Sequence, residues 1–205
     1  MLPEPLTEFQ WEKARRGKIS ASRLGDVLAH PGTKRRKGYL HDTVLDHGPA
    51  PDFQNAGEPA PWFRTGREFE QEGLGAYQWH VQADLYPGLG TDWRLFMLHP
   101  ALSFVGCSPD GLVGLDGGFE LKCTVVADNH LKVKRNGMPA VHKPQVQGCL
   151  WVTGRTFWDF GSYHVPTQDL AVVRIYPDEA YHNRLDAACR EFWQEVQEEL
   201  SGKRR

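Results

Sequence analysis

The chain has 205 residues, a length that a single domain with one buried core can accommodate. Hydrophobic residues at 40% and charged residues at 24% exclude a disordered chain, and the net charge of −2 excludes a generic nucleic-acid coat. A net charge of −2 does not exclude an enzyme that holds DNA in a local groove. Apolar runs such as residues 170–173 are too short to cross a bilayer, and the N-terminus lacks a secretory signal pattern. We therefore expect a cytoplasmic protein without a membrane partner.

The first eighty residues are predicted to be helical. The helices are expected at residues 11–16, after a cap at Ser20, at residues 39–47 and at residues 62–79. A capping box at Thr7 to Gln10 begins the first helix, and Pro61 begins the last. Two loops are expected between them, the basic stretch 32–38 and the stretch 48–61, which is rich in Pro, Gly and Ala.

The second half of the chain changes to the periodicity of strands. Strands are predicted at residues 95–98, 102–107, 118–123, 156–164 and 170–176. Pro144 begins a helix that runs to Val152, and Asp178 begins a final helix with apolar residues at helical spacing. This order predicts one α/β or α+β domain over residues 1–205, in which helices cover a sheet.

The four cysteines are scattered through the chain and form no C-x-x-C pair. Their spacing therefore predicts neither a zinc site nor a disulfide framework; they are Cys107, Cys123, Cys149 and Cys189. Their apolar neighbours indicate reduced and mostly buried thiols. The nine histidines also lack ligand spacing, so none is assigned to a metal.

One stretch combines residues that can carry out chemistry. Pro109 and Gly111 form a turn that presents Asp110. In the strand that follows, Glu120 and Lys122 share one face, about 6.6 Å apart along the chain, while the apolar residues between and around them face a core. If the hairpin places Asp110 beside Glu120, two carboxylates and one ammonium converge.

Two adjacent carboxylates repel each other unless a cation stabilises them, and Mg²⁺ is a hard cation that takes oxygen ligands. A metal-bound water oriented by Lys122 could then attack a phosphodiester. The alternative is structural, because such a turn is common and an E-x-K strand is usually a solvated face. The combination at this spacing favours the metal site.

This arrangement resembles the PD-(D/E)xK nuclease signature, and the chain resembles the lambda-exonuclease-like (YqaJ-type viral recombinase) family over almost its whole length. The resemblance is carried by Trp11 to Ser22, Gly66 with Glu70, Cys107 to Leu112, Glu120 to Cys123, Gln145 to Gln147, Trp151 to Thr153 and Phe160 to Tyr163. It implies a restriction-endonuclease-like mixed β-sheet flanked by helices in a bacterial or phage protein. It also implies Mg²⁺-dependent, or Mn²⁺-dependent, 5′→3′ digestion of double-stranded DNA ends, a homotrimeric ring, and a single-strand annealing protein as partner in phage-type recombination.

The resemblance also implies roles for individual residues. Asp110, Glu120, the Leu121 carbonyl and Glu70 are expected at the metal, with Lys122 acting on the nucleophilic water. The pocket for the terminal 5′-phosphate is expected to consist of Arg15, Ser22, Ser108 and Gln147. A guanidinium, hydroxyls and an amide can all donate to phosphate oxygens, which makes this set chemically sensible. Taken alone, Glu70 would be an exposed helix carboxylate and Arg15 a surface arginine.

Further residues are expected to contact DNA. Trp11 is expected to stack on the end nucleotide, Phe63 to act as a wedge between terminal base pairs, and Lys34, Arg35, Arg36 and Lys37 to grip backbone phosphates. The alternatives are core positions for Trp11 and Phe63 and a solvated loop for the basic run.

Two other functions stay open. One is an endonuclease on the same fold, and the other is a DNA-end-binding module whose metal site is vestigial. The intact Asp110, Glu120 and Lys122 argue against the second. The stretch His142 to Pro144 departs from relatives that carry a tyrosine there, so no role is transferred to it.

Overall fold

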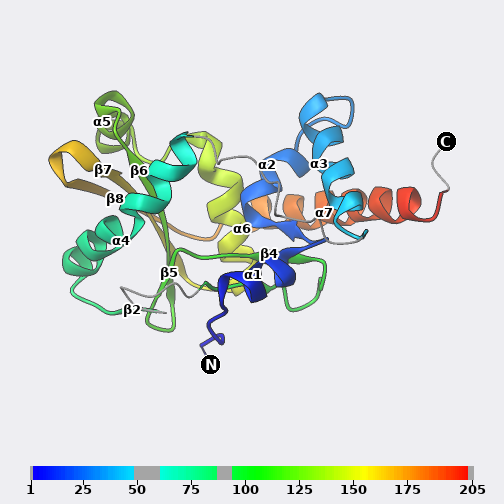
Figure 1. Cartoon of the computed structure of the whole chain (residues 1–205), viewed down its shortest axis with the longest axis horizontal. Coiled ribbons are helices and arrows are strands. Elements are labelled where there is room, and N and C mark those ends of the chain that lie inside the picture. Colours follow the sequence, from blue (N-terminus) through cyan, green and yellow to red (C-terminus); the bar gives the residue numbers. More distant parts are fainter. Residues whose placement is uncertain (1, 49–60, 87–93, 203–205) are drawn as a thin grey trace.

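The computed structural model describes residues 2–48, 61–86 and 94–202, and for residues 61–68 it describes only the backbone. Helices surround two small β-sheets in this part of the chain (Figure 1). The expected α/β fold with a mixed sheet flanked by helices is confirmed. No helix in the described ranges is both long and apolar enough to span a membrane.

The larger sheet has five strands and positions the site. Its strands, in the order in which they pair, are β2 (Leu85–Tyr86), β5 (Gly111–Val113), β6 (Gly117–Thr124), β7 (Phe157–His164) and β8 (Asp169–Ile175). β6 and β7 pair in parallel with Glu120 opposite Phe160 and Lys122 opposite Ser162, whereas the other pairs are antiparallel. The two long central strands are buried on both faces for most of their length.

A smaller sheet joins the N-terminal region to the centre of the chain. It consists of β1 (Ile19–Ser20), β4 (Val105–Cys107) and β3 (Met97–Leu98), with β4 in the middle. β1 runs parallel to β4 and pairs Ser20 with Gly106. This pairing brings Ser20, and Ser22 just after it, next to the strand that leads into Asp110.

The N-terminal region contains four helical elements, of which the first and the last have side-chain caps. They are α1 (Glu8–Arg15), the 3-10 turn η1 (Ala21–Arg23), α2 (Leu24–Val27) and α3 (Lys34–Leu45). The expected capping box of α1 is present, because Thr7 Oγ1 accepts from the Gln10 amide and the Gln10 side chain accepts from the Thr7 amide. Ser20 precedes η1 without a side-chain cap, contrary to the prediction. The next helix, α3, does have a side-chain cap, because Thr33 Oγ1 accepts from the Arg36 amide.

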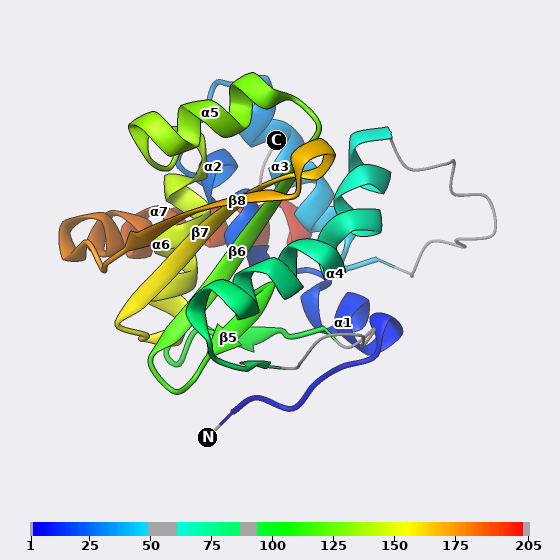
Figure 2. The same cartoon turned by 90° about the vertical axis from the view of Figure 1, so that its left-hand side faces the viewer.

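The four remaining helices are α4 (Pro61–Val81), α5 (Ala127–Asn136), α6 (Lys143–Thr153) and α7 (Glu179–Leu200), and the 3-10 turns η3 (Ala140–His142) and η4 (Val165–Thr167) lie between elements. Three of these helices pack on the five-stranded sheet, and the fourth, α7, packs on α3 and α6. Asp178 caps α7 as predicted, and Gly154 ends α6 in a left-handed conformation. Figure 2 shows α4 in front of the sheet and α6 and α7 behind it.

Two apolar clusters hold these layers together. On the α4 side, the Tyr77 and Phe119 rings stack with their centroids 3.6 Å apart. On the α6 side, a larger cluster joins the sheet to α2, α3 and α7. All four cysteines are free thiols, three of them buried and Cys123 partly buried, as expected.

Two further features differ from the sequence predictions, and one prediction is not tested. The basic stretch 32–38 is not a loop, because Lys34 to Lys37 form the first turn of α3. Helix α5 and the short strands β1, β2 and β5 were not predicted. The expected loop 48–61 lies almost entirely outside the described residues.

Candidate active site

The carboxylates of Asp110 and Glu120 lie together because a hairpin joins their strands. β5 and β6 pair with Gly111 opposite Phe119, which places the preceding residue, Asp110, opposite Glu120. The Asp110 amide donates to the Phe119 carbonyl at 3.2 Å, and the Asp110 carboxylate accepts the Leu121 amide at 2.7 Å. The convergence expected from the sequence is therefore present, and two hydrogen bonds donated by main-chain amides fix it.

Glu120 is withdrawn from water, and Asp110 is half-buried beside it. Only 1% of Glu120 is exposed. Burial, and then the neighbouring Glu120 carboxylate, raises the pKa of Asp110 well above its usual range. Within the described structure, Glu120 Oε2 is buried and has no hydrogen-bond partner. An unsatisfied buried oxygen beside a second carboxylate is what a hard cation would compensate, so these donors fit Mg²⁺.

Two side chains meet the other oxygen of Glu120. Lys122, which shares its face of β6, forms an ion pair with Glu120 Oε1. Gln145, in the first turns of α6, donates to the same oxygen at 2.6 Å. Burial alone disfavours the charged ammonium, but Glu120 and Asp110 raise the pKa of Lys122, so it stays protonated. Gln145 was not assigned a role from the sequence, although it lies in one of the stretches that carry the resemblance.

Glu70 approaches this pair from α4. Its charge adds to the rise in the pKa of Asp110 and of Cys123. Its own carboxylate accepts from Arg94 Nη1 at 3.1 and 3.4 Å. Across the ranges that the structure describes, no three His, Cys, Asp or Glu side chains are gathered in a metal-binding cluster. Asp110 and Glu120 are thus a preformed pair, while Glu70 is bound to an arginine.

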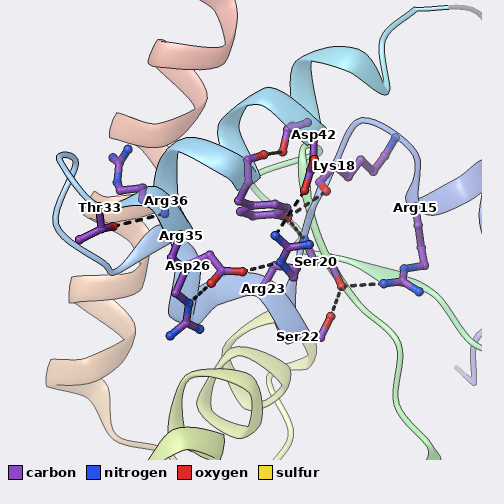
Figure 3. Close-up of polar contacts among 12 residues, drawn as sticks. Arg15, Lys18, Ser20, Ser22, Arg23, Asp26, Thr33, Arg35, Arg36 and Asp42 are labelled. Carbon is purple, nitrogen blue, oxygen red and sulfur yellow. Dashed lines mark hydrogen bonds and ion pairs between the residues drawn. The ribbon is translucent and has the colours of Figure 1, made fainter. Parts of the chain in front are cut away.

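A group that we call the N-terminal polar cluster lies at the C-terminal end of β4, next to the turn that presents Asp110. It consists of Trp11, Arg15, Ser20, Ser22 and Ser108. Figure 3 shows Arg15 pointing to Ser20, which in turn contacts Ser22, and the two contacts measure 3.4 and 3.1 Å. Trp11 Nε1 donates to Ser108 Oγ at 2.9 Å, and the Arg15 guanidinium lies 4.2 Å from the centroid of the Trp11 ring.

This cluster brings together three of the four side chains expected to bind a terminal phosphate. Arg15, Ser22 and Ser108 converge, and Ser20 joins them as a further hydroxyl. Burial lowers the pKa of Arg15, because a charged guanidinium is costly away from water. An anion at this place would offset that cost.

Gln147, the fourth expected residue, is not brought to the cluster. It is 3% exposed, and its amide donates to the Tyr176 carbonyl at 2.9 Å and accepts from the Asp178 amide at 3.0 Å and from His182 at 2.8 Å. The expectation for Gln147 is therefore corrected: its side chain ties α6 to the start of α7. Gln145, two positions earlier, reaches the carboxylates instead.

The basic run is split between two environments. Lys34 and Lys37 are exposed, and Arg35 pairs with the buried Asp26 (Figure 3). Arg36 is 3% exposed, bonds to Glu195 at 2.8 Å and donates to the Val27 carbonyl at 3.2 Å. The expectation that Arg36 contacts backbone phosphates is therefore corrected. Its guanidinium is buried and connects α3 to α7. Phe63 lies in α4, but its side chain is outside the described part of the structure.

Known proteins share this architecture. A family model described as the YqaJ-like viral recombinase domain matches residues 10–156. The alkaline exonuclease LHK-Exo from Laribacter hongkongensis has a similar structure, with a TM-score of 0.78 and 25% identity over 94% of each chain. Its complex with dAMP gives a TM-score of 0.79 at the same identity and coverage. A phage-related exonuclease from Haemophilus somnus 129PT shares the fold, with a TM-score of 0.61 and 14% identity over 90% of this chain and 96% of that chain. No curated protein sequence matches the chain.

Proposed function

Because the chain belongs to the YqaJ-like viral recombinase domain family, we propose that it is a Mg²⁺-dependent exonuclease that digests one strand of double-stranded DNA from its 5′ end. The family and the similarity to an alkaline exonuclease support a nuclease. The metal, the polarity and the role in recombination are our proposals.

The observation that carries the proposal is the pair of carboxylates, of which Glu120 is buried and Asp110 half-buried. Asp110 and Glu120 lie opposite each other, and Glu120 Oε2 has no partner among the described residues. We assign the metal to these two side chains and to the Leu121 main-chain carbonyl, with Glu70 as the additional carboxylate. When bound, Mg²⁺ or Mn²⁺ would polarise the phosphoryl group and acidify a water molecule.

The side chains around this pair have separate tasks. The Lys122 ammonium, held by Glu120, would donate a hydrogen bond to the attacking water and offset negative charge on the phosphoryl oxygens. Gln145 would keep the Glu120 carboxylate in its orientation by donating to Oε1. Removing such a supporting contact typically lowers the metal affinity or the activity by about ten- to a hundredfold.

The N-terminal polar cluster supports the 5′→3′ polarity. Arg15, Ser20 and Ser22 offer a guanidinium and two hydroxyls to one anion, and Ser108 connects them to the turn that carries Asp110. A terminal 5′-phosphate held there would place the first phosphodiester bond of that strand at the carboxylates. Trp11 would stack on the terminal nucleotide. The exposed Lys34, Arg35 and Lys37 are the remaining candidates to contact the duplex.

Digestion from a 5′ end leaves a 3′ single-stranded overhang, which is the substrate of strand annealing. We therefore place the enzyme in phage-type recombination in the cytoplasm, with a single-strand annealing protein as partner. A closed homotrimeric ring would keep DNA attached despite the net charge of −2. Light scattering should give three times the chain mass of 23.3 kDa. A stable monomer that remains processive against competitor DNA would contradict the ring.

The activity is tested with linear, nicked and covalently closed duplex DNA. We expect linear DNA to disappear with Mg²⁺ and to survive with EDTA, and closed circles to survive in both. Digestion of nicked or covalently closed circles would favour the endonuclease. Binding of DNA ends without hydrolysis in Mg²⁺ or Mn²⁺ would favour the binding module.

A further inference from the structure

Arg94 holds Glu70, the additional carboxylate of the proposed metal site. Arg94 Nη1 donates to both oxygens of the Glu70 carboxylate, at 3.1 and 3.4 Å. The two side chains are 31% and 21% exposed, so water reaches this ion pair and either group can exchange it for another partner. While the pair persists, a guanidinium neutralises the charge that Glu70 would bring to a cation beside Asp110.

The same guanidinium borders the N-terminal polar cluster. Its central carbon lies 5.9 Å from the centroid of the Trp11 ring, and that of Arg15 lies 4.2 Å from the same centroid. Burial is the main cause of the lowered pKa of Arg15, and the charge of Arg94 lowers it further. The described contacts of Arg15 are with a hydroxyl and a ring, which carry no charge. An anion at this place would therefore attract both guanidinium groups.

Arg94 has a fixed main chain, so only its side chain can change partners. Its amide and its carbonyl form a bridge to Leu6, with both hydrogen bonds at 2.8 Å. The segment that carries Leu6 is held in turn by Tyr86, whose hydroxyl donates to the Pro3 carbonyl at 2.6 Å. An arginine side chain has several rotamers about a fixed Cα atom, so its guanidinium can contact Glu70 in one rotamer and turn to the cluster in another.

We infer that Arg94 is a positioning residue that couples the binding of a terminal 5′-phosphate to the binding of the metal. The inference rests on the proposed function. When the N-terminal polar cluster is empty, Arg94 neutralises Glu70. A terminal phosphate in the cluster carries more negative charge than a carboxylate, so Arg94 turns to it and joins Arg15. Glu70 can then complete the metal site beside Asp110 and Glu120.

This exchange ties cleavage to a phosphorylated end. A site with fewer carboxylate ligands holds a divalent cation less tightly, and a 5′-hydroxyl end leaves Arg94 on Glu70. Linkage makes the effect reciprocal, because the phosphate raises the affinity for the metal by the same factor as the metal raises the affinity for the phosphate. Couplings between two sites typically amount to about 5- to 150-fold, and we expect at least about fivefold here.

Metal binding without hydrolysis measures the coupling. Mn²⁺ is titrated into the protein and its free concentration is followed by electron paramagnetic resonance, with either 5′-dAMP or deoxyadenosine present. Neither compound has a phosphodiester bond to cut, and only 5′-dAMP has a terminal 5′-phosphate. After correction for Mn²⁺ that 5′-dAMP binds in solution, 5′-dAMP should raise the affinity of the wild type for Mn²⁺ at least about fivefold over deoxyadenosine.

Arg94→Gln separates the exchange from a direct attraction between phosphate and metal. With deoxyadenosine, the variant should bind Mn²⁺ at least about fivefold more tightly than the wild type, because Glu70 is already released, and 5′-dAMP should add less than about twofold. A residue with only a structural role would instead weaken the metal site when it is replaced. Arg190→Gln, which removes an exposed pair with Asp186 on α7, is the matched control and should behave like the wild type.

Equal affinities of the wild type for Mn²⁺ with the two compounds, or a gain from 5′-dAMP that persists in Arg94→Gln, would overturn the coupling. Absence of Mn²⁺ binding in both states would overturn it together with the metal site. The proposed function fails separately. Digestion of linear duplexes in Mg²⁺ without the coupling would leave the exonuclease standing, whereas the coupling without hydrolysis would refute the exonuclease and support the role of Arg94.

Discussion

Gln147→Ala should destabilise the protein without impairing its chemistry. The Gln147 amide satisfies the Tyr176 carbonyl and the Asp178 amide at the junction of β8 and α7, and it also accepts from His182. Truncation leaves a donor and an acceptor unpaired in a part-buried place, at about 1–3 kcal/mol for each group. We expect a loss of about 3 kcal/mol in the free energy of unfolding, which lowers Tm by about 6–12 °C in a chain of this size.

Thermal melting and initial rates below the melting range measure this effect. Gln145→Ala is the matched control, since Gln145 is half-buried on the same helix and contacts Glu120 rather than α7. It should melt within about 2 °C of the wild type, because it removes one part-exposed hydrogen bond, and it should lose about tenfold or more in kcat. If Gln147→Ala melts like the wild type and loses the preference for 5′-phosphorylated ends, the assignment of these two glutamines is wrong.

Three further substitutions test separate parts of the account. Lys122→Ala should lower the cleavage rate by more than about tenfold, or about 1.4 kcal/mol, with end binding retained, and a rate above a tenth of wild type would reject the role of Lys122. Arg15→Ala should equalise the rates on 5′-phosphate and 5′-hydroxyl ends, and equal wild-type rates on the two ends would remove the phosphate pocket. His142 binds a proton near pH 6.5 when unfolded but only near pH 4 when folded, so stability should fall as the pH drops through that window. His142→Phe should flatten this fall in urea titrations, and an unchanged pH dependence would contradict the buried neutral ring.

The central hairpin could be predicted because its chemistry follows from local rules. A turn at Pro109 to Gly111 and an alternating strand fix which residues face each other, whatever packs around them. The same holds for the helices that Thr7 and Asp178 cap, because each cap is encoded in a few neighbouring residues. The family resemblance identified from these blocks is confirmed.

The glutamines show where the sequence is insufficient. Gln145 and Gln147 are two positions apart on α6, so they point about 200° apart around the helix and only one can face the carboxylates. Which one does so depends on the rotation of α6, and this is set by the packing of Val146 and Leu150 in the larger core. That packing is tertiary, so no local pattern reports it.

The structure of the basic run was predicted wrongly, and the short strands were not predicted, for related reasons. Gly32 and Gly38 indicated a loop, but Thr33 caps a helix there, and the contact of Arg36 with Glu195 on α7 stabilises it. The strands β1, β2 and β5 have only two or three residues, too few for a period to be visible. Helix α5 has only His130 and Val133 buried, so its apolar signal is weak.

The most direct test of the central claim follows the two ends of one strand. A 5′-phosphorylated linear duplex carries one label on the first nucleotide and another on the last nucleotide of the same strand, and both are followed after Mg²⁺ is added. We expect the 5′ label to leave first, as a mononucleotide, while the 3′ label stays in a strand that shortens progressively. Earlier release of the 3′ label, or early appearance of internal fragments that carry either label, would contradict a 5′→3′ exonuclease built on Asp110, Glu120 and Lys122.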